Sequence, residues 1–177
     1  MEFFETVKRR HSYRGGYKDM VVRQDELLAI VQAGLDAPSG KNTQTTRFVI
    51  IDDPDLLGQI RAMHLTNKAM QQAKVFIACI IDRQPKPVYE GLAFQIEDCA
   101  AAVENMLLAI TALGYASVWI DGWLRSEGHA ETIGNMLGVP ETKIIRVLLP
   151  IGMPAEDIQP PKKMLFNERA WFNRYGG

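Results

Sequence analysis

The residues of this chain best suited to chemistry are cations, and they gather near its beginning. Residues 8–23 hold six Lys or Arg and a single acid, in a protein whose formal net charge is −1. Arg10, Ser12 and Arg14 alternate with other residues there, and a glycine pair follows. Two guanidiniums and a hydroxyl suit a phosphate, because they combine donors of fixed shape with charge. The segment therefore predicts an anion site, and a solvated basic surface is the usual alternative.

A second polar segment, residues 37–44, separates a helical pattern from an apolar one. It offers donors and acceptors without charge at Ser39, Asn42 and Gln44. Such groups suit the edge of a planar heterocycle, where donors and acceptors alternate. The alternative is an ordinary helix–strand connection.

Composition argues against several other kinds of site. A charged fraction of 23% with net charge −1 lacks the basic excess of nucleic-acid-binding proteins. No apolar run has the length of a membrane span, and the first ten residues lack the order of a secretory signal. The two cysteines and three histidines show no metal-ligand spacing. We expect a cytoplasmic protein with no structural metal, no nucleic-acid partner and no membrane partner.

Apolar runs separated by helical patterns predict an organisation with both helices and strands. The predicted strands are residues 47–51, 75–81, 116–120 and 144–151. The predicted helices are residues 2–9, 24–36 and 96–113, one that starts at Asp53-Pro54, and one that Ser126 caps. Neither G-x-G-x-x-G nor G-x-x-x-x-G-K-[ST] occurs, so a bound nucleotide would depend on side-chain cations.

The helix predicted over residues 96–113 is the central element. It is polar only along a narrow stripe, which indicates burial over most of its circumference. Gly114 supplies the positive φ of a helix end, and the strand after it leads to Asp121-Gly122. Either this helix is the core of a monomer, or it packs against its own copy. Likewise, the aromatic residues at 167–175 form either a tail folded back on its domain or an arm around a second subunit.

Four motifs in register resemble those of the nitroreductase family of FMN-dependent oxidoreductases. Residues 9–14 (RRHSYR) are similar to the family's R-R-x-S-x-R, and residues 37–44 (APSGKNTQ) to its A-P-S-x-x-N-x-Q. Residues 113–120 (LGYASVWI) resemble its strand after the long helix, and residues 152–154 (GMP) resemble its late G-x-P turn. The resemblance covers nearly the whole chain.

The resemblance implies an α+β fold with a central mixed, mostly antiparallel sheet flanked by helices. It implies a homodimer with the long helix at the interface and two FMN sites there. Residues 1–154 would form the FMN-binding domain. Residues 155–177 would be a C-terminal arm of the same domain that packs on the partner subunit.

The resemblance also assigns cofactor contacts to particular positions. The contacts implied at the phosphate and ribityl chain are Arg10, His11, Ser12 and Arg14, with Lys162 or Lys163. The contacts implied at the flavin ring from the partner subunit are Pro38, Ser39, Gly40 and Asn42. Asp121 and Gly122 would lie beside N5, and Asn67 or Lys68 would lie at the pyrimidine edge. Two departures stand out. Thr45-Thr46 replace the family's frequent Pro-Trp, and Met164 stands where a second late cation is common.

The implied chemistry belongs to the flavin, so no protein residue is assigned as catalytic. NADH or NADPH would pass hydride to flavin N5, and a nitroaromatic, quinone or similar acceptor would then take the electrons in a ping-pong scheme. The alternatives are a non-catalytic FMN carrier or redox sensor, a related flavin enzyme that dehalogenates or degrades flavin, and a phosphate-binding module without flavin.

Overall fold

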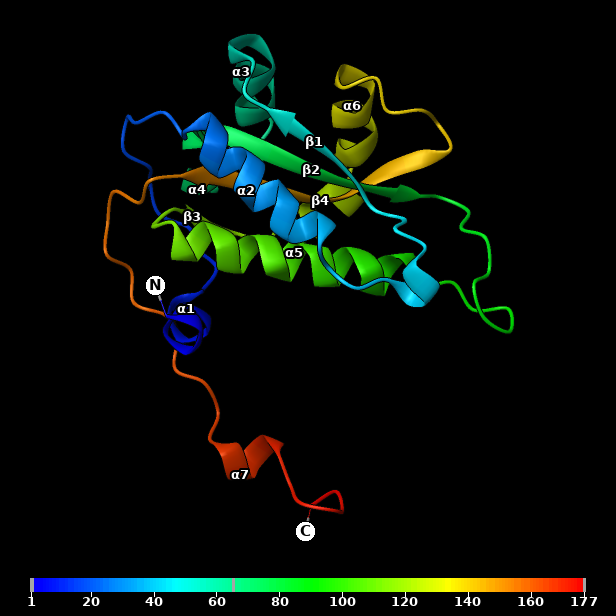
Figure 1. The fold of residues 1–177 in the computed structure, drawn as a ribbon. Helices are drawn as coiled ribbons and strands as arrows, with labels where there is room; N and C mark the ends of the chain where they lie inside the picture. Colours follow the sequence, from blue (N-terminus) through cyan, green and yellow to red (C-terminus); the bar gives the residue numbers. More distant parts are fainter. Residues whose placement is uncertain (1, 65, 177) are drawn as a thin grey trace.

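The computed structural model describes residues 2–64 and 66–176. Its longest helix, α5 (Gln95–Ala112), lies along one face of the central sheet (Figure 1). Val103, Met106 and Ile110 on its inner side are almost fully buried. The helix ends where the sequence predicted, because Gly114 adopts a φ of +87°.

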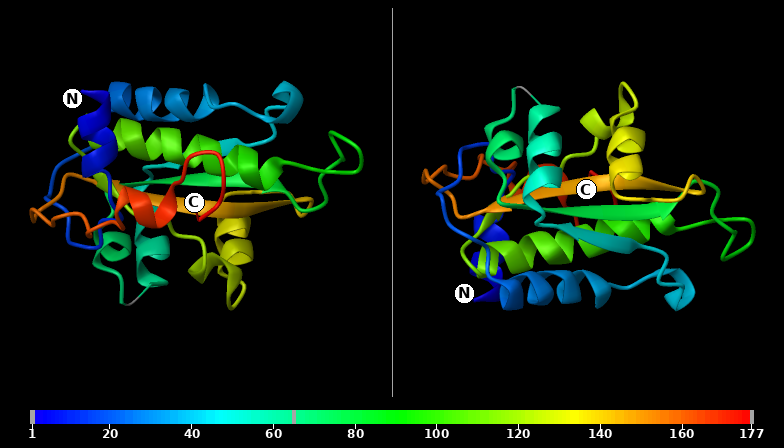
Figure 2. Two further views of the ribbon diagram at one scale, coloured as in Figure 1. Left: turned by 90° about the horizontal axis from the view of Figure 1, so that it is seen from below. Right: turned by 90° about the horizontal axis from the view of Figure 1, so that it is seen from above.

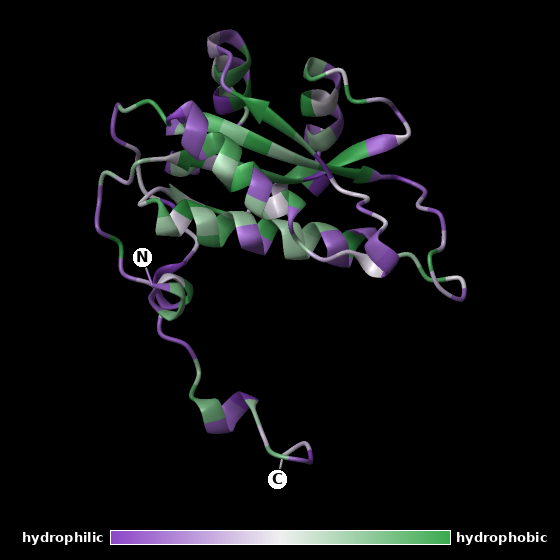
Figure 3. Cartoon of the chain, viewed as in Figure 1, coloured by the Kyte–Doolittle hydropathy of each residue, from purple (hydrophilic) through white to green (hydrophobic). Residues whose placement is uncertain are grey.

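The sheet has four strands in the order β1-β2-β4-β3. They are β1 (Arg47–Ile51), β2 (Val75–Asp82), β3 (Ala116–Ser117) and β4 (Lys143–Gly152). Every pairing between these strands is antiparallel, which agrees with the predicted mostly antiparallel sheet. Central strands covered on both faces require continuous apolar sequence, and Figure 3 shows such colouring along the strands.

Helices cover both faces of the sheet (Figure 2). On one side lie α2 (Gln24–Leu35) and α5; on the other lie α3 (Pro54–Ala62), α4 (Lys68–Gln72) and α6 (His129–Met136). Successive residues of β2 point to opposite faces, so Phe76 joins one apolar core and Ile77 the other. No helix in the described ranges combines the length and apolar character needed to cross a membrane.

The predicted helix starts hold at two places and fail at a third. Glu2 caps α1 (Phe3–Arg9), and Asp53 caps α3 with proline in its first turn. The sequence predicted that Ser126 caps α6, but it does not. A short 3₁₀ turn (Trp123–Arg125) intervenes, and α6 starts after Gly128.

The predicted strand over residues 116–120 is shorter than expected. Only Ala116–Ser117 pairs continuously with β4, and Ile120 then makes an isolated bridge to Leu148. In this register Val118 lies opposite Pro150, which has no N–H to donate. The proline therefore interrupts the ladder.

After β4, residues 154–156 stay hydrogen-bonded to residues 13–17. The later part of the C-terminal segment runs away from the sheet and carries the short helix α7 (Phe166–Arg169) (Figure 1). Three of its aromatic side chains are largely exposed, 67% for Phe166, 82% for Phe172 and 92% for Tyr175, whereas Trp171 is half-buried. The segment therefore does not fold back as an apolar tail on its own domain. Such a cluster of exposed aromatic residues is typical of an interaction surface.

Candidate functional site

The predicted anion-binding segment is held rigidly against the edge of the sheet. The Tyr13 N–H donates to the Ser117 carbonyl at 2.9 Å, and the Tyr13 hydroxyl donates to the Gly16 carbonyl at 2.6 Å. The buried Tyr17 hydroxyl donates to the Pro150 carbonyl at 3.1 Å. Burial raises the pKa of Tyr17 far above its ordinary value, so this phenol remains a donor. These contacts fix the backbone on both sides of Arg14.

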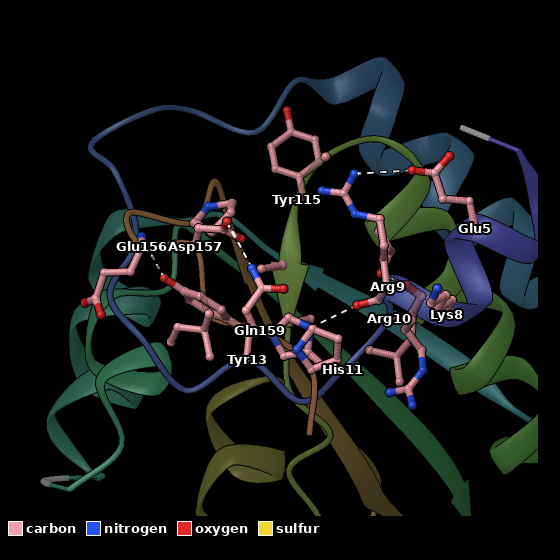
Figure 4. Close-up of a pocket in the computed structure, with 18 residues that line it drawn as sticks. Glu5, Lys8, Arg9, Arg10, His11, Tyr13, Tyr115, Glu156, Asp157 and Gln159 are labelled. Carbon is pink, nitrogen blue, oxygen red and sulfur yellow. Dashed lines mark hydrogen bonds and ion pairs between the residues drawn. The ribbon is translucent and has the colours of Figure 1, made fainter. Parts of the chain in front are cut away.

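A cavity of about 530 Å³ opens between α1, β3 and residues 154–160 (Figure 4). Arg10 and His11 line it, and Figure 4 shows Glu156 and Asp157 on the side opposite Arg9. Its walls therefore carry both signs of charge, with the cations on the α1 side.

The guanidinium of Arg10 is oriented by an acid on the central helix. Arg10 Nε lies 3.1 Å from the Glu104 carboxylate, and the Arg10 side chain is only 22% exposed. The contact occupies Nε and leaves the two terminal nitrogens for another ligand. An arginine held in this way is prepared to bind a phosphate bidentately.

Two buried polar atoms beside this cavity lack a hydrogen-bond partner within the described part of the chain. They are His11 Nε2 and Ser117 Oγ. His11 Nδ1 lies 2.9 Å from the Arg9 carbonyl, so Nδ1 donates its proton to that carbonyl and Nε2 is left for another partner. Buried polar groups without partners are costly, which makes these two atoms candidates for contact with a ligand.

The loop at residues 37–44 is anchored to α5 by the buried Asp98. One carboxylate oxygen accepts the Gly40 N–H at 2.9 Å, and the other accepts the Thr45 hydroxyl at 3.0 Å. A side chain at Gly40 would meet Phe94, since its Cβ would lie 2.7 Å from that ring. This anchoring explains the departure at Thr45, whose hydroxyl ties the loop to the helix.

Replacing Asp98 with alanine is expected to lower the free energy of unfolding by about 1–3 kcal/mol, because the partly buried Gly40 N–H would lose its acceptor. Chemical denaturation measures the change. The matched control is Glu97→Ala on the exposed side of the same helix turn, which should stay within about 0.5 kcal/mol of wild type. Equal losses in the two variants would contradict the anchoring role.

The turn at Asp121 and Gly122 is tied to β4. Ile120 exchanges two backbone hydrogen bonds with Leu148, and the Asp121 carboxylate accepts from Arg125 at 2.6 and 2.7 Å and from Arg146. Burial alone would raise the pKa of Asp121, but the two guanidiniums outweigh it and hold that pKa below its ordinary value. Asp121 is therefore a carboxylate, and it is not suited to donate a proton.

Next to this turn, the Trp123 ring lies between two histidines. Its centroid is 4.0 Å from that of His129 and 4.9 Å from that of His64. His129 Nδ1 lies 2.9 Å from the Trp123 carbonyl, whereas His64 Nδ1 is buried without a partner in the described ranges. Burial and the nearby His129 lower the pKa of His64 below its ordinary value of 6.5.

The low pKa of His64 predicts a pH dependence of stability. The unfolded chain binds a proton on His64 below pH 6.5 more readily than the folded chain, so the free energy of unfolding should fall as pH drops through 6.5. Above that pH the contribution should be constant. In thermal melts between pH 8 and pH 5, His64→Phe should show a flatter pH dependence while keeping a ring against Trp123. Identical pH profiles for the variant and wild type would be inconsistent with this assignment.

The structure brings some predicted site residues together and leaves others apart. Pro38 and Ser39 line a second cleft of about 650 Å³ beside α5. Asn67 caps α4, with its side-chain oxygen accepting from two backbone N–H groups, so only its amide nitrogen is available for a ligand. The remaining predicted residues, Ser12, Arg14, Gly40, Asn42, Asp121, Gly122, Lys162 and Lys163, do not line either cavity.

The sequence reasoning missed the side chains that orient this site, namely Asp98, Glu104, Ser117 and Arg146. Asp98 and Glu104 lie in or beside the polar stripe of the long helix, which was the available signal. Ser117 lies within the motif at residues 113–120, which was its signal. Arg146 had no signal, because its role depends on a contact with a distant part of the chain. Within residues 2–64 and 66–176, no group of three or more His, Cys, Asp or Glu is placed to hold a metal ion.

The sequence model of the nitroreductase family matches residues 7–75 and 59–153. The chain belongs to the nitroreductase family. It is 28% identical over 156 residues to an Archaeoglobus fulgidus protein that carries the provisional name NADH dehydrogenase/NAD(P)H nitroreductase. That match covers 88% of this chain and 87% of the relative.

Solved structures of nitroreductases share the fold. The nitroreductase with bound FMN from Bacteroides fragilis has a TM-score of 0.74 at 27% identity, with 93% of this chain and 95% of that one covered. The FMN-dependent nitroreductase from Clostridium difficile has a TM-score of 0.79 at 27% identity, with coverage of 97% and 99%. The predicted family and α+β fold are confirmed.

Proposed function

We propose that the protein is an FMN-dependent NAD(P)H oxidoreductase that reduces nitroaromatics, quinones or similar small acceptors. The observation that carries this proposal is the cavity beside α1, where an oriented Arg10 lies with His11 Nε2 and Ser117 Oγ, two atoms that have no partner among the described residues. A phosphate on a hydroxylated chain has the acceptors and donors that these three groups lack. Membership of the nitroreductase family supports the same ligand.

In this proposal the N-terminal segment and the late lysines hold the FMN phosphate. Arg10 contributes its terminal nitrogens, and the exposed residues Ser12 and Arg14 follow it closely in the chain. Lys162 and Lys163 are exposed and lie two and three residues after Pro160, the last residue that lines the cavity. A modest movement of this segment would bring a lysine to the phosphate.

The flavin ring requires a second subunit in this proposal. Pro38, Ser39, Gly40 and Asn42 would approach the ring from the partner subunit, and Asn67 from its own. The exposed aromatic residues of 166–175 support a homodimer, because they are more apolar surface than a monomer usually leaves in water. In this proposal the C-terminal segment is therefore an arm that packs on the partner subunit.

Bound FMN would supply the hydride chemistry. The residues of this chain bind it, orient it and tune its charge. The backbone at Asp121 and Gly122 would hydrogen-bond flavin N5, and the turn is suited to this role because Leu148 and two arginines hold it. Donor and acceptor would use the same cleft in turn, and the protons taken up by the reduced acceptor would come from solvent, so no acid–base residue is assigned.

Steady-state kinetics test this scheme. We expect NADH or NADPH oxidation with a quinone acceptor to give parallel double-reciprocal lines, as a ping-pong mechanism requires. Intersecting lines would contradict it.

The proposal also places the protein in the cytoplasm, a reducing compartment that suits the buried free thiols of Cys79 and Cys99.

A further inference from the structure

Strand β4 contains an irregularity at Arg146. Its neighbour β2 pairs Cys79 with Val147 and Ile80 with Ile145, so two adjacent residues of β2 face positions that are two apart in β4. Arg146 is the extra residue of this bulge. Bulges redirect a side chain and occur often beside active sites.

The bulge directs the Arg146 side chain to the turn at Asp121. Arg146 NH1 contacts the Asp121 carboxylate, and the Arg146 side chain is only 17% exposed. Arg125 holds the same carboxylate in a bidentate manner, but its side chain is 59% exposed. Two guanidiniums on one carboxylate leave a net charge of +1 at this turn.

The geometry points to Arg146 as a positioning residue for flavin reduction: its bulge fixes the Asp121–Gly122 turn and places a partly buried positive charge there. This inference rests on the proposed function, in which that turn meets flavin N5. A reduced flavin carries more negative charge than an oxidised one, so a nearby cation favours the reduced form. The Arg146 charge should matter more than that of Arg125, because water and salt screen exposed charges strongly.

The test compares the reduction potential of bound FMN in two matched variants, Arg146→Gln and Arg125→Gln. Each removes one guanidinium from the same carboxylate. We expect Arg146→Gln to lower the ratio of reduced to oxidised flavin about tenfold at a fixed solution potential. For a two-electron couple this is a shift of the flavin reduction potential by about 30 mV to more negative values. Arg125→Gln should shift the potential less than half as far, and Arg146→Lys should restore most of the wild-type value.

An unchanged potential in Arg146→Gln holoprotein, or equal shifts in Arg146→Gln and Arg125→Gln, would overturn the inference. If Arg146→Gln does not fold, Asp121→Asn gives a second test, because it removes the negative charge and keeps both arginines. That variant should shift the potential to more positive values, and no shift or a negative shift would overturn the inference. Wild-type protein that binds no FMN would instead refute the proposed function, so the two failures are distinguishable.

Discussion

Replacing Arg10 with alanine is expected to raise the dissociation constant of FMN about 10- to 150-fold. Arg10 is partly buried and oriented by Glu104, so it should make a charge-assisted contact with the phosphate worth about 1.5–3 kcal/mol. Titration of the apoprotein with FMN, followed by the quenching of flavin fluorescence, measures the constant.

Arg23→Ala is the matched control for this prediction. Arg23 belongs to the same basic segment, but its side chain is 68% exposed, pairs with Asp25 and lies outside the cavity. It should leave FMN affinity within about twofold of wild type, because a distant exposed charge is screened. Similar losses in both variants would indicate a diffuse electrostatic effect, and wild-type affinity in Arg10→Ala would refute the phosphate assignment.

The second large effect is expected from the C-terminal aromatic residues. The double variant Phe166→Ser with Phe172→Ser should raise the dimer dissociation constant at least about a thousandfold. The two side chains are 67% and 82% exposed in the isolated chain, and each phenylalanine buried in a dimer contributes about 1.5–3 kcal/mol. A two-fold dimer would contain four such residues. Sedimentation velocity over a range of concentrations measures the effect.

This variant keeps Lys162 and Lys163, so association is tested apart from the proposed phosphate contacts. Val21→Ser is the control, because Val21 is equally apolar and 87% exposed but belongs to another part of the surface. It should leave association unchanged. A double variant that dimerises like wild type would rule out the exchanged arm.

Most of the fold could be predicted because its signals are local. Continuous apolar runs marked β1, β2 and β4, and Gly114 marked the end of α5. Caps such as Asp53 act within one turn of the chain, so they are readable from neighbouring residues. The short β3 was not readable, since Pro150, which interrupts its ladder, lies 32 positions away from Val118.

The motifs of the candidate site could be predicted from the sequence, but the side chains that hold those motifs in place could not. The anion-binding segment and the loop at residues 37–44 were visible as clusters of polar side chains. Their anchors were not, because Asp98 reaches Gly40 across 58 positions and Arg146 reaches Asp121 across 25. Such contacts depend on the register of the sheet and on the path of α5, which sequence periodicity does not determine.

An anaerobic absorbance spectrum of the purified protein, after incubation with FMN and removal of the excess, tests the central claim most directly. We expect flavin bands that bleach when NADPH or NADH is added and return when a quinone or nitroaromatic follows. The donor that bleaches the bands faster would establish the nicotinamide preference. A protein that retains no flavin, or whose flavin bands persist with both donors, would contradict the proposed oxidoreductase.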